Sequence, residues 1–298
     1  MAMNSINTNV AAMTALQNLA ATQTQLSVTQ NRINTGLKIA SAKDNGAIWA
    51  IAQTEKAQSV SLDAVTNSLN NGKSVLDTTL QAGSQMTDIL NQMRAKALAA
   101  SDAGIDDASR TQYENEFAKL GQSYANVVAS AGFNGVNLID ASTGAISAIG
   151  SADAGIKITS AHDSLNAATL FTTSLTTVAG TVVAPSTVAS VDTVTSKGNW
   201  ADGTGANAKS ALTEIDAAIK SVTQGLSGFG VDSKAIDNQT TLVSKLQDSL
   251  NAGIGNLVDA NLAQESANLQ SLQTKQQLGV QALSIANQST GILLGLFR

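Results

Sequence analysis

The sequence predicts a mainly α-helical protein: a long antiparallel helical bundle or coiled coil from both chain ends, with a small β-rich or irregular middle insertion. Three observations predict this class. Hydrophobic residues make up 43% of the 298 residues but aromatic residues only 3%, so small aliphatic side chains must form the core. The single proline, Pro185, leaves room for very long uninterrupted helices. Apolar residues also recur every three or four positions on both sides of the middle.

The clearest repeat lies between residues 62 and 97. Its spacing alternates between three and four, which is a heptad seam along a helical stretch roughly 50 Å long at about 1.5 Å per residue. The seam consists of Leu62, Val65, Leu69, Gly72, Leu76, Thr79, Gly83, Met86, Leu90, Met93 and Ala97. The two glycines lower helix propensity but let a partner helix come close.

A second helix is expected after a break at residues 101–104. Asp106 or Asp107 can cap its start, because a short carboxylate accepts hydrogen bonds from the first free backbone N–H groups. Its apolar stripe is Tyr113, Phe117, Leu120, Tyr124 and Val127.

A matching seam occupies the C-terminal half, with a few polar gaps. It consists of Leu212, Ile215, Ile219, Val222, Leu226, Phe229, Ile236, Val243, Leu250, Ile254 and Leu257. Because the two seams flank the middle of the chain, the simplest arrangement folds the chain back on itself into one helical bundle.

The middle, residues 141–205, has a different composition. It is rich in Ser, Thr, Val and Gly, and its stretches 156–159 and 181–183 favour β-strand. No Lys, Arg, Asp or Glu lies between Asp163 and Asp192. The composition fits equally a small β-rich insertion and an irregular excursion.

The two ends are helical but nearly without charge. Residues 1–43 contain no acidic residue, and the last forty residues carry only Asp259, Glu265, Lys275 and Arg298 as charged side chains. Apolar stripes run through both ends: Ala12, Leu19, Leu26 and Ile33 in one, and Leu262, Leu269, Leu272, Leu283 and Ala286 in the other. Their remaining faces are interpreted as Gln, Asn, Thr and Ser, whereas a solvated helix normally carries Lys and Glu there. We therefore expect these faces to pack against other copies of the chain.

Composition also argues against several classes of function. The net charge of −5 has no basic block, which speaks against nucleic acid, and no apolar run is long enough to span a membrane. The chain has no cysteine, and its one histidine, His162, has no metal-ligand motif around it. No acid, base and nucleophile set is visible, so we predict no enzyme, no metal and no cofactor.

Several blocks near both ends stand out in the sequence: residues 5–9 (SINTN), 32–39 (RINTGLKI), 41–44 (SAKD), 133–135 (FNG) with Leu138, 211–218 (ALTEIDAA), 286–288 (ANQ) and 293–298 (LLGLFR). In sequence, in order and in distance from the ends, these blocks resemble bacterial flagellins. The resemblance covers residues 1–139 and 208–298. The variant at residues 44–49 (DNGAIW), the short chain and the small middle are similar to alphaproteobacterial members.

The resemblance implies a subunit that polymerises into the flagellar filament used for swimming. Residues 1–43 with 259–298 would form the inner tube, residues 44–140 with 206–258 an outer helical bundle, and residues 141–205 an exposed variable insertion. Subunit packing is assigned to Leu19, Leu26, Ile33, Leu69, Leu76, Leu90, Leu250, Leu257, Leu269, Leu272, Leu283 and Leu294. Localisation would be extracellular, after type III export without a cleaved signal, with an export chaperone and cap or junction proteins as partners.

Other interpretations stay open at this point. A hook–filament junction protein has similar terminal helices, and a soluble coiled-coil adaptor would share the seams but needs charged outer faces. The hydroxyls of the middle are either a plain polar surface or acceptors of O-linked sugars. Many flagellins carry an Arg-rich patch for an innate immune receptor where this chain has residues 92–97, and only Arg94 fits it.

Overall fold

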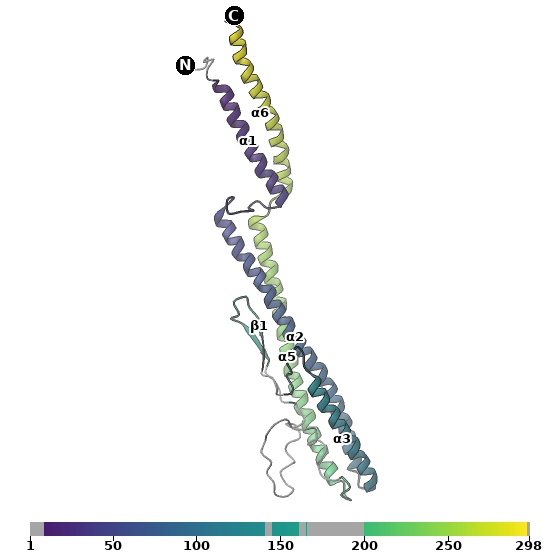
Figure 1. Ribbon diagram of the computed structural model, residues 1–298. Helices are drawn as coiled ribbons and strands as arrows, with labels where there is room; N and C mark the ends of the chain where they lie inside the picture. The colour runs from purple at the N-terminus through teal and green to yellow at the C-terminus, as the bar shows by residue number, and fades with distance from the viewer. Residues whose placement is uncertain (1–8, 141–144, 161–164, 166–199, 297–298) are drawn as a thin grey trace. The chain divides into compact units, whose positions relative to one another are not determined.

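The computed structural model describes residues 9–140, 145–160, 165 and 200–296, with the backbone alone for residues 289–296 (Figure 1). The chain divides into two compact units. Unit 1 combines Met1–Val60 with Gln247–Arg298, and unit 2 is Ser61–Leu246. The described part is mainly helical with one small sheet, which confirms the predicted fold class.

The long helix α2 (Gly46–Ala100) contributes the predicted seam to unit 2. All eleven seam positions between residues 62 and 97 are buried, and Leu69, Leu76 and Leu90 have no exposed surface. The antiparallel partner is α5 (Ala206–Val258). Ion pairs mark its course along α2: Lys73 Nζ lies 2.7 Å from Asp237 Oδ1, and Arg94 Nε lies 2.6 Å from Asp216 Oδ1.

The buried stripe of α5 differs from the predicted one in its small residues. Five of the predicted positions are buried, and Leu212, Ile219, Leu226, Leu250, Ile254 and Leu257 are half-buried. The fully covered row alternates large and small side chains instead: Ala208, Ala211, Ile215, Ala218, Val222, Gly225 and Phe229. Small residues bring the helices close together, and larger neighbours then fill the flanks of the contact.

Arg110 stabilises the turn between α2 and α3 (Asp107–Ser130). Its guanidinium is 1% exposed and donates to the carbonyls of Ala100 (3.2 Å) and Asp102 (2.8 Å). These carbonyls have no partner within α2, so Arg110 satisfies the end of that helix. Asp106 stands at the N-cap of α3 as predicted, but no side-chain cap hydrogen bond forms there. On α3, Phe117 and Tyr124 are buried.

The described part of the middle contains one two-stranded antiparallel sheet. Strands β1 (Ile146–Ile149) and β2 (Lys157–Ser160) pair from Ile146 with Ser160 to Ile149 with Lys157. The strand predicted at residues 156–159 is therefore confirmed. The stretch 181–183, Pro185 and His162 lie outside the described residues.

Two buried residues attach the middle to α3. The Tyr124 hydroxyl donates to the Leu165 carbonyl (2.6 Å), and burial raises the pKa of Tyr124 well above its usual value. The Trp200 ring lies 5.0 Å from that of Phe117, centroid to centroid. Leu165 and Trp200 are each 2% exposed, so both residues are anchored in the core of unit 2.

Unit 1 contains α1 (Val10–Thr35) and α6 (Leu262–Leu296), which pack against each other along their length. Gly36 ends α1 with a positive φ of 71°, a conformation in which a glycine is favoured. The segments that follow α1 and precede α6 are joined by backbone hydrogen bonds. Lys38 N donates to Val258 O (2.6 Å), and Ala260 N donates to Gly36 O (2.9 Å).

Candidate assembly surface

The inner faces of α1 and α6 hold this helix pair together. Leu26 and Leu272 are 6% and 7% exposed, and Leu19, Ile33, Leu269 and Leu283 are half-buried. Two polar contacts join the helices as well: Gln276 Nε2 donates to Gln23 Oε1 (2.7 Å), and Asn9 Nδ2 donates to the Ala286 carbonyl (2.8 Å). The predicted terminal stripes therefore face each other within one chain.

The residues assigned to subunit packing divide into groups by their surroundings. Six of them, Leu19, Leu26, Ile33, Leu269, Leu272 and Leu283, lie in the α1–α6 pair at low or intermediate exposure. Leu69, Leu76 and Leu90 are enclosed by the helices of their own unit 2, so they offer no surface to another copy. Leu250 and Leu257 are half-buried, and the side chain of Leu294 lies outside the described residues.

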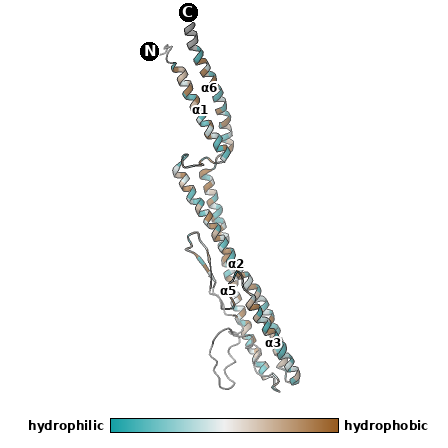
Figure 2. Ribbon diagram, viewed as in Figure 1, coloured by the Kyte–Doolittle hydropathy of each residue, from teal (hydrophilic) through white to brown (hydrophobic). Residues whose placement is uncertain are grey.

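The outer faces of α1 and α6 carry exposed apolar side chains, which corrects the interpretation of these faces as amides and hydroxyls alone. On α1 these are Val10 (56% exposed), Met13 (57%), Leu16 (57%) and Val28 (40%). On α6 they are Leu262 (49%), Leu278 (58%), Val280 (54%) and Ile285 (67%). Brown, hydrophobic stretches mark both helices in Figure 2. The sequence signal was present, because each of these residues except Leu262 stands off the stripe of its helix.

Threonine hydroxyls on these helices are largely satisfied within the helix itself. Thr14, Thr22 and Thr24 each donate to the carbonyl four residues earlier, at 2.8–3.0 Å. A hydroxyl with an internal partner presents mainly its methyl group outward, and covering it removes little hydration. These positions are therefore better suited to dry packing than their residue type suggests.

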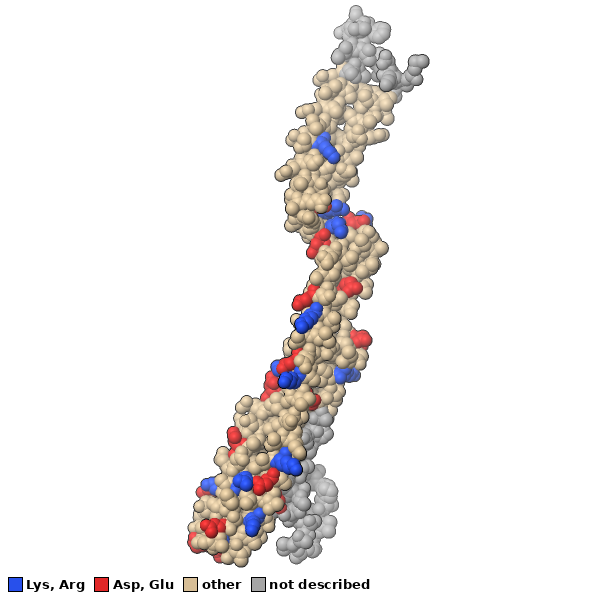
Figure 3. Space-filling model, turned by 180° about the vertical axis from the view of Figure 1, so that it is seen from behind, with Lys and Arg blue, Asp and Glu red and all other residues tan. Residues whose placement is uncertain are grey.

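Charge on the pair is limited to three side chains. α1 contains Arg32 alone, and α6 contains Glu265 and Lys275. Arg32 Nη1 lies 3.1 Å from Glu265 Oε1, and the Glu265 side chain is only 11% exposed. Because a mostly buried carboxylate needs a partner, this ion pair fixes the register of the two helices near their bases. In Figure 3 the α1–α6 region is almost wholly tan, while blue and red side chains alternate over unit 2.

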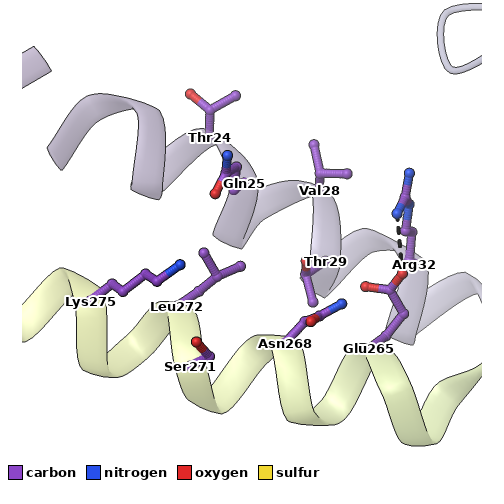
Figure 4. Close-up of a pocket in the computed structure, with 10 residues that line it drawn as sticks. All are labelled: Thr24, Gln25, Val28, Thr29, Arg32, Glu265, Asn268, Ser271, Leu272 and Lys275. Carbon is purple, nitrogen blue, oxygen red and sulfur yellow. Dashed lines mark hydrogen bonds and ion pairs between the residues drawn. The ribbon is translucent and has the colours of Figure 1, made fainter. Parts of the chain in front are cut away.

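A shallow hollow of ≈ 350 Å³ lies between α1 and α6 beside this ion pair (Figure 4). Of its lining residues, Thr29 and Leu272 are buried, and Val28 and Lys275 are exposed. The full lining is Thr24, Gln25, Val28, Thr29, Arg32, Glu265, Asn268, Ser271, Leu272 and Lys275. The mixture of hydroxyl, amide and apolar groups suits contact with a side chain from another protein surface.

Below the pair, a small apolar cluster belongs to unit 1. Ile39, Ala52 and Val258 are its buried members, with Trp49 and Leu257 packed against it. Asp44 accepts hydrogen bonds from the backbone N–H groups of Ala40 and Ser41, and those bonds lower the pKa of its carboxyl group.

In the described part of the chain, no helix is long and apolar enough to cross a bilayer. Across the same residues, no group of three or more His, Asp or Glu side chains is placed to hold a metal ion.

Comparison with known families gives these features a context. The family model of the bacterial flagellin N-terminal helical region matches residues 6–143, and that of the C-terminal helical region matches residues 212–297. Flagellin FljK of Caulobacter vibrioides is 46% identical over 299 residues, with all of both chains covered. The chain belongs to the bacterial flagellin family. It is a structural subunit of the extracellular flagellar filament, which confirms the resemblance found in the sequence.

A further relative agrees with this assignment. A flagellin of Brucella melitensis is 36% identical, covering 99% of this chain and all of the relative. The crystal structure of Bacillus cereus flagellin aligns over 59% of this chain and 88% of the other, at 19% identity and a TM-score of 0.46, and the assignment does not depend on it.

Proposed function

We propose that the exposed apolar faces of α1 and α6 are the contacts through which copies of the chain join in the filament. The observation that carries this proposal is the set of eight large apolar side chains, 40–67% exposed, on two helices that hold three charges between them. Burying one such side chain contributes about 1.5–3 kcal/mol. Burying several of them together would favour association strongly.

The same proposal assigns a role to each part of the chain. Residues 1–43 with 259–298 would line the inner tube, and residues 44–140 with 206–258 would form the outer bundle. Residues 141–205 would stand exposed on the outside. The breaks between helices at residues 36–45 and 259–261 support these boundaries, whereas the compact units divide at residues 60/61 and 246/247. The charges on the surface of unit 2 support an outer, hydrated position for that bundle.

Export is the second part of the proposal. The chain would leave the cell unfolded and without loss of a signal segment, aided by an export chaperone, and meet cap or junction proteins at the filament. The absence of cysteine supports threading, because no disulfide can form and obstruct it. Hydroxyls in residues 141–205 would accept O-linked sugars, and an intact mass of filament protein equal to the sequence mass would contradict that.

Oxidation of methionine tests the assembly surface directly. Met13 is 57% exposed in the single chain, while Met86 and Met93 have no exposed surface. Dilute hydrogen peroxide should oxidise Met13 rapidly in monomers and slowly in filaments, and both buried methionines slowly in either state. Peptide mass spectrometry measures all three together. Equal oxidation rates of Met13 in monomer and filament would contradict the proposal that this face of α1 lies in a subunit contact.

A truncation tests the C-terminal end independently. Deleting residues 283–298 removes Ile285 and the last turns of α6, and we expect filaments to disappear in electron micrographs. The helix content contributed by unit 2 should remain, because unit 2 is a compact unit with a buried seam of its own. Filaments of normal form from the truncated chain would contradict the assignment.

A further inference from the structure

The chain contains three Asn–Gly pairs, in three different surroundings: Asn45–Gly46, Asn71–Gly72 and Asn134–Gly135. Among pairs of Asn and a following residue, Asn–Gly is the most reactive, because glycine has no side chain to hinder attack of its backbone nitrogen on the asparagine side chain. Whether that nitrogen can react depends on how the fold holds it.

The pair Asn134–Gly135 occupies the centre of an exposed tight turn. Asn134 has φ 50° and Gly135 has φ 78°, the two positive values of a type I′ turn. Phe133 and Val136 close the turn by exchanging two backbone hydrogen bonds, of 2.9 and 3.0 Å. Among the described hydrogen bonds, none engages the Gly135 N–H or the Asn134 amide, and no atom lies within 4 Å of a Cβ built on Gly135.

The other two pairs are held by helix α2. Gly72 is buried inside it, its N–H is donated along the helix, and a Cβ added there would lie 3.2 Å from the Ala148 Cβ. Asn45 precedes the first turn, and its Oδ1 accepts a hydrogen bond from Ile48 N (3.2 Å). That bond holds the side-chain amide in a capping position.

We infer that Asn134 is the chain's site of spontaneous deamidation. The Gly135 nitrogen, as it loses its proton, attacks Cγ of Asn134. A Cγ–N bond forms, the Cγ–Nδ2 bond breaks, and ammonia leaves with the proton. Water then opens the resulting succinimide on either side, which gives aspartate or isoaspartate. Water is the only co-reactant, and no oxidant or reductant takes part.

The reaction changes both the charge and the backbone at the end of α3. Each event adds one carboxylate, and the isoaspartate product adds a methylene to the backbone between Phe133 and Val136. The segment that follows is tightly packed: Leu138 and Ile139 have no exposed surface, and Asn137 Nδ2 donates to the Val128 carbonyl (2.7 Å). Lengthening the turn therefore loosens the hold of this segment on α3.

A time course with internal controls tests the inference. The full-length protein is incubated in mildly alkaline buffer, native and in urea, until half of its Asn–Gly pairs have reacted in urea. Peptide mass spectrometry reads the amide-to-acid mass change at each pair, and an isoaspartate-specific methyltransferase assay reads the rearranged product. Native protein should react at Asn134 at least about tenfold faster than at Asn71, with Asn45 between them, because local opening of a surface turn costs far less than opening a buried helix.

The urea sample separates the effect of the fold from that of local sequence. The three pairs should react at similar rates there, and an unchanged ranking in urea would overturn the structural explanation. Native protein whose Asn134 stays intact, or whose Asn71 reacts equally fast, would overturn the inference as well. The variant Gly135→Ala should lose the reaction at Asn134 in urea, where strain at the positive φ plays no part, and keep it at Asn45.

Discussion

The bundle of unit 2 and the α1–α6 pair of unit 1 use the same three–four spacing of apolar residues and reach different degrees of burial. Along α2 the seam from Leu62 to Ala97 is buried at every position, and ion pairs such as Lys73–Asp237 lie on the surface. On the α1–α6 pair, the inner stripe is only partly covered, and Leu16 and Ile285 point outward at 57% and 67% exposure. The helical repeat is common to both units.

The difference lies in what covers the second face of each helix. Two helices can bury only one stripe each, whereas α2 also contacts α3 and the segment around β1. Unit 2 therefore completes its core within one chain. Unit 1 leaves a second apolar face uncovered, as expected of a surface that copies of the chain cover.

A charge placed on the seam should have the largest effect on the bundle. Leu90→Asp puts a carboxylate where a side chain has no exposed surface, and we expect a loss of about 3–5 kcal/mol in the free energy of unfolding. Leu242→Asp on α5 is the matched control, because Leu242 is 49% exposed, and its change should stay within about 0.5 kcal/mol. Chemical denaturation measures both. Equal losses of unfolding free energy in the two variants would contradict the distinction between buried seam and exposed surface.

On the α1–α6 pair the corresponding substitution should affect assembly and leave the subunit alone. Leu16→Asn removes an exposed leucine, so the melting curve of the monomer should not move. The critical concentration for filament growth should rise by about tenfold to a hundredfold, the equivalent of 1.5–3 kcal/mol. Leu26→Asn, on the buried side of the same helix, should also weaken the contact between α1 and α6. An unchanged critical concentration for Leu16→Asn would contradict the outward role.

Close helix contact within unit 2 can be tested at Gly83. A Cβ on this residue would overlap Leu226 Cδ2 and lie 2.9 Å from its Cγ, so the leucine side chain must move. Overpacking costs about 1–3 kcal/mol, and the gain in helix propensity returns about 1 kcal/mol. Gly83→Ala should thus lower the free energy of unfolding by about 1 kcal/mol. The further loss caused by Leu226→Ala should be smaller in the Gly83→Ala variant than in the original chain. Additive losses in this double-mutant cycle would rule out the contact.

The smallest expected effect concerns the start of α5. Asp202 accepts hydrogen bonds from the backbone N–H groups of Thr204, Gly205 and Asn207, and these bonds lower its pKa from 3.8 to about 2. Because the folded-state pKa lies below the unfolded value, the stabilisation is complete above about pH 4 and is lost as the pH falls toward 2. Asp202→Ala should cost about 1 kcal/mol at neutral pH. Denaturation curves at several pH values should show the two proteins converging in acid, and a constant difference would refute this role.

Much of the fold could be predicted from periodicity, and the exceptions have physical causes. Heptad spacing predicts that Leu69 and Leu90 are buried, because large apolar residues at regular intervals of three and four indicate the buried face of a helix. The same criterion passed over Ala211 and Ala218, which are buried and whose small size suits close packing of helices. It could not find Arg110 either, since a charged residue is predicted at the surface, and only the carbonyls at the end of α2 explain its burial.

For the proposed assembly surface, the residues that the structure leaves exposed largely differ from those that the predicted stripes name. The scarcity of charge in both ends predicts that α1 and α6 pack against other copies, and this stays a prediction. The stripe residues Leu26 and Leu272 turned out to face each other, since two helices from the same chain satisfy that stripe first. Val10, Met13 and Val280 stand off the predicted stripes, and that position already indicates the exposure that the structure shows.

Asn9 donates to the carbonyl of Ala286, 277 positions further along the polypeptide. Contacts of such high sequence separation form late, because the entropy of closing so long a loop opposes them. During synthesis on a ribosome, α1 is complete while α6 is still untranslated, so a nascent chain holds its first helix without a partner almost until termination. A premature stop codon anywhere before residue 262 would leave α1 permanently without its partner helix. The side of α1 that normally packs against α6 would then stay exposed and could associate with other apolar surfaces.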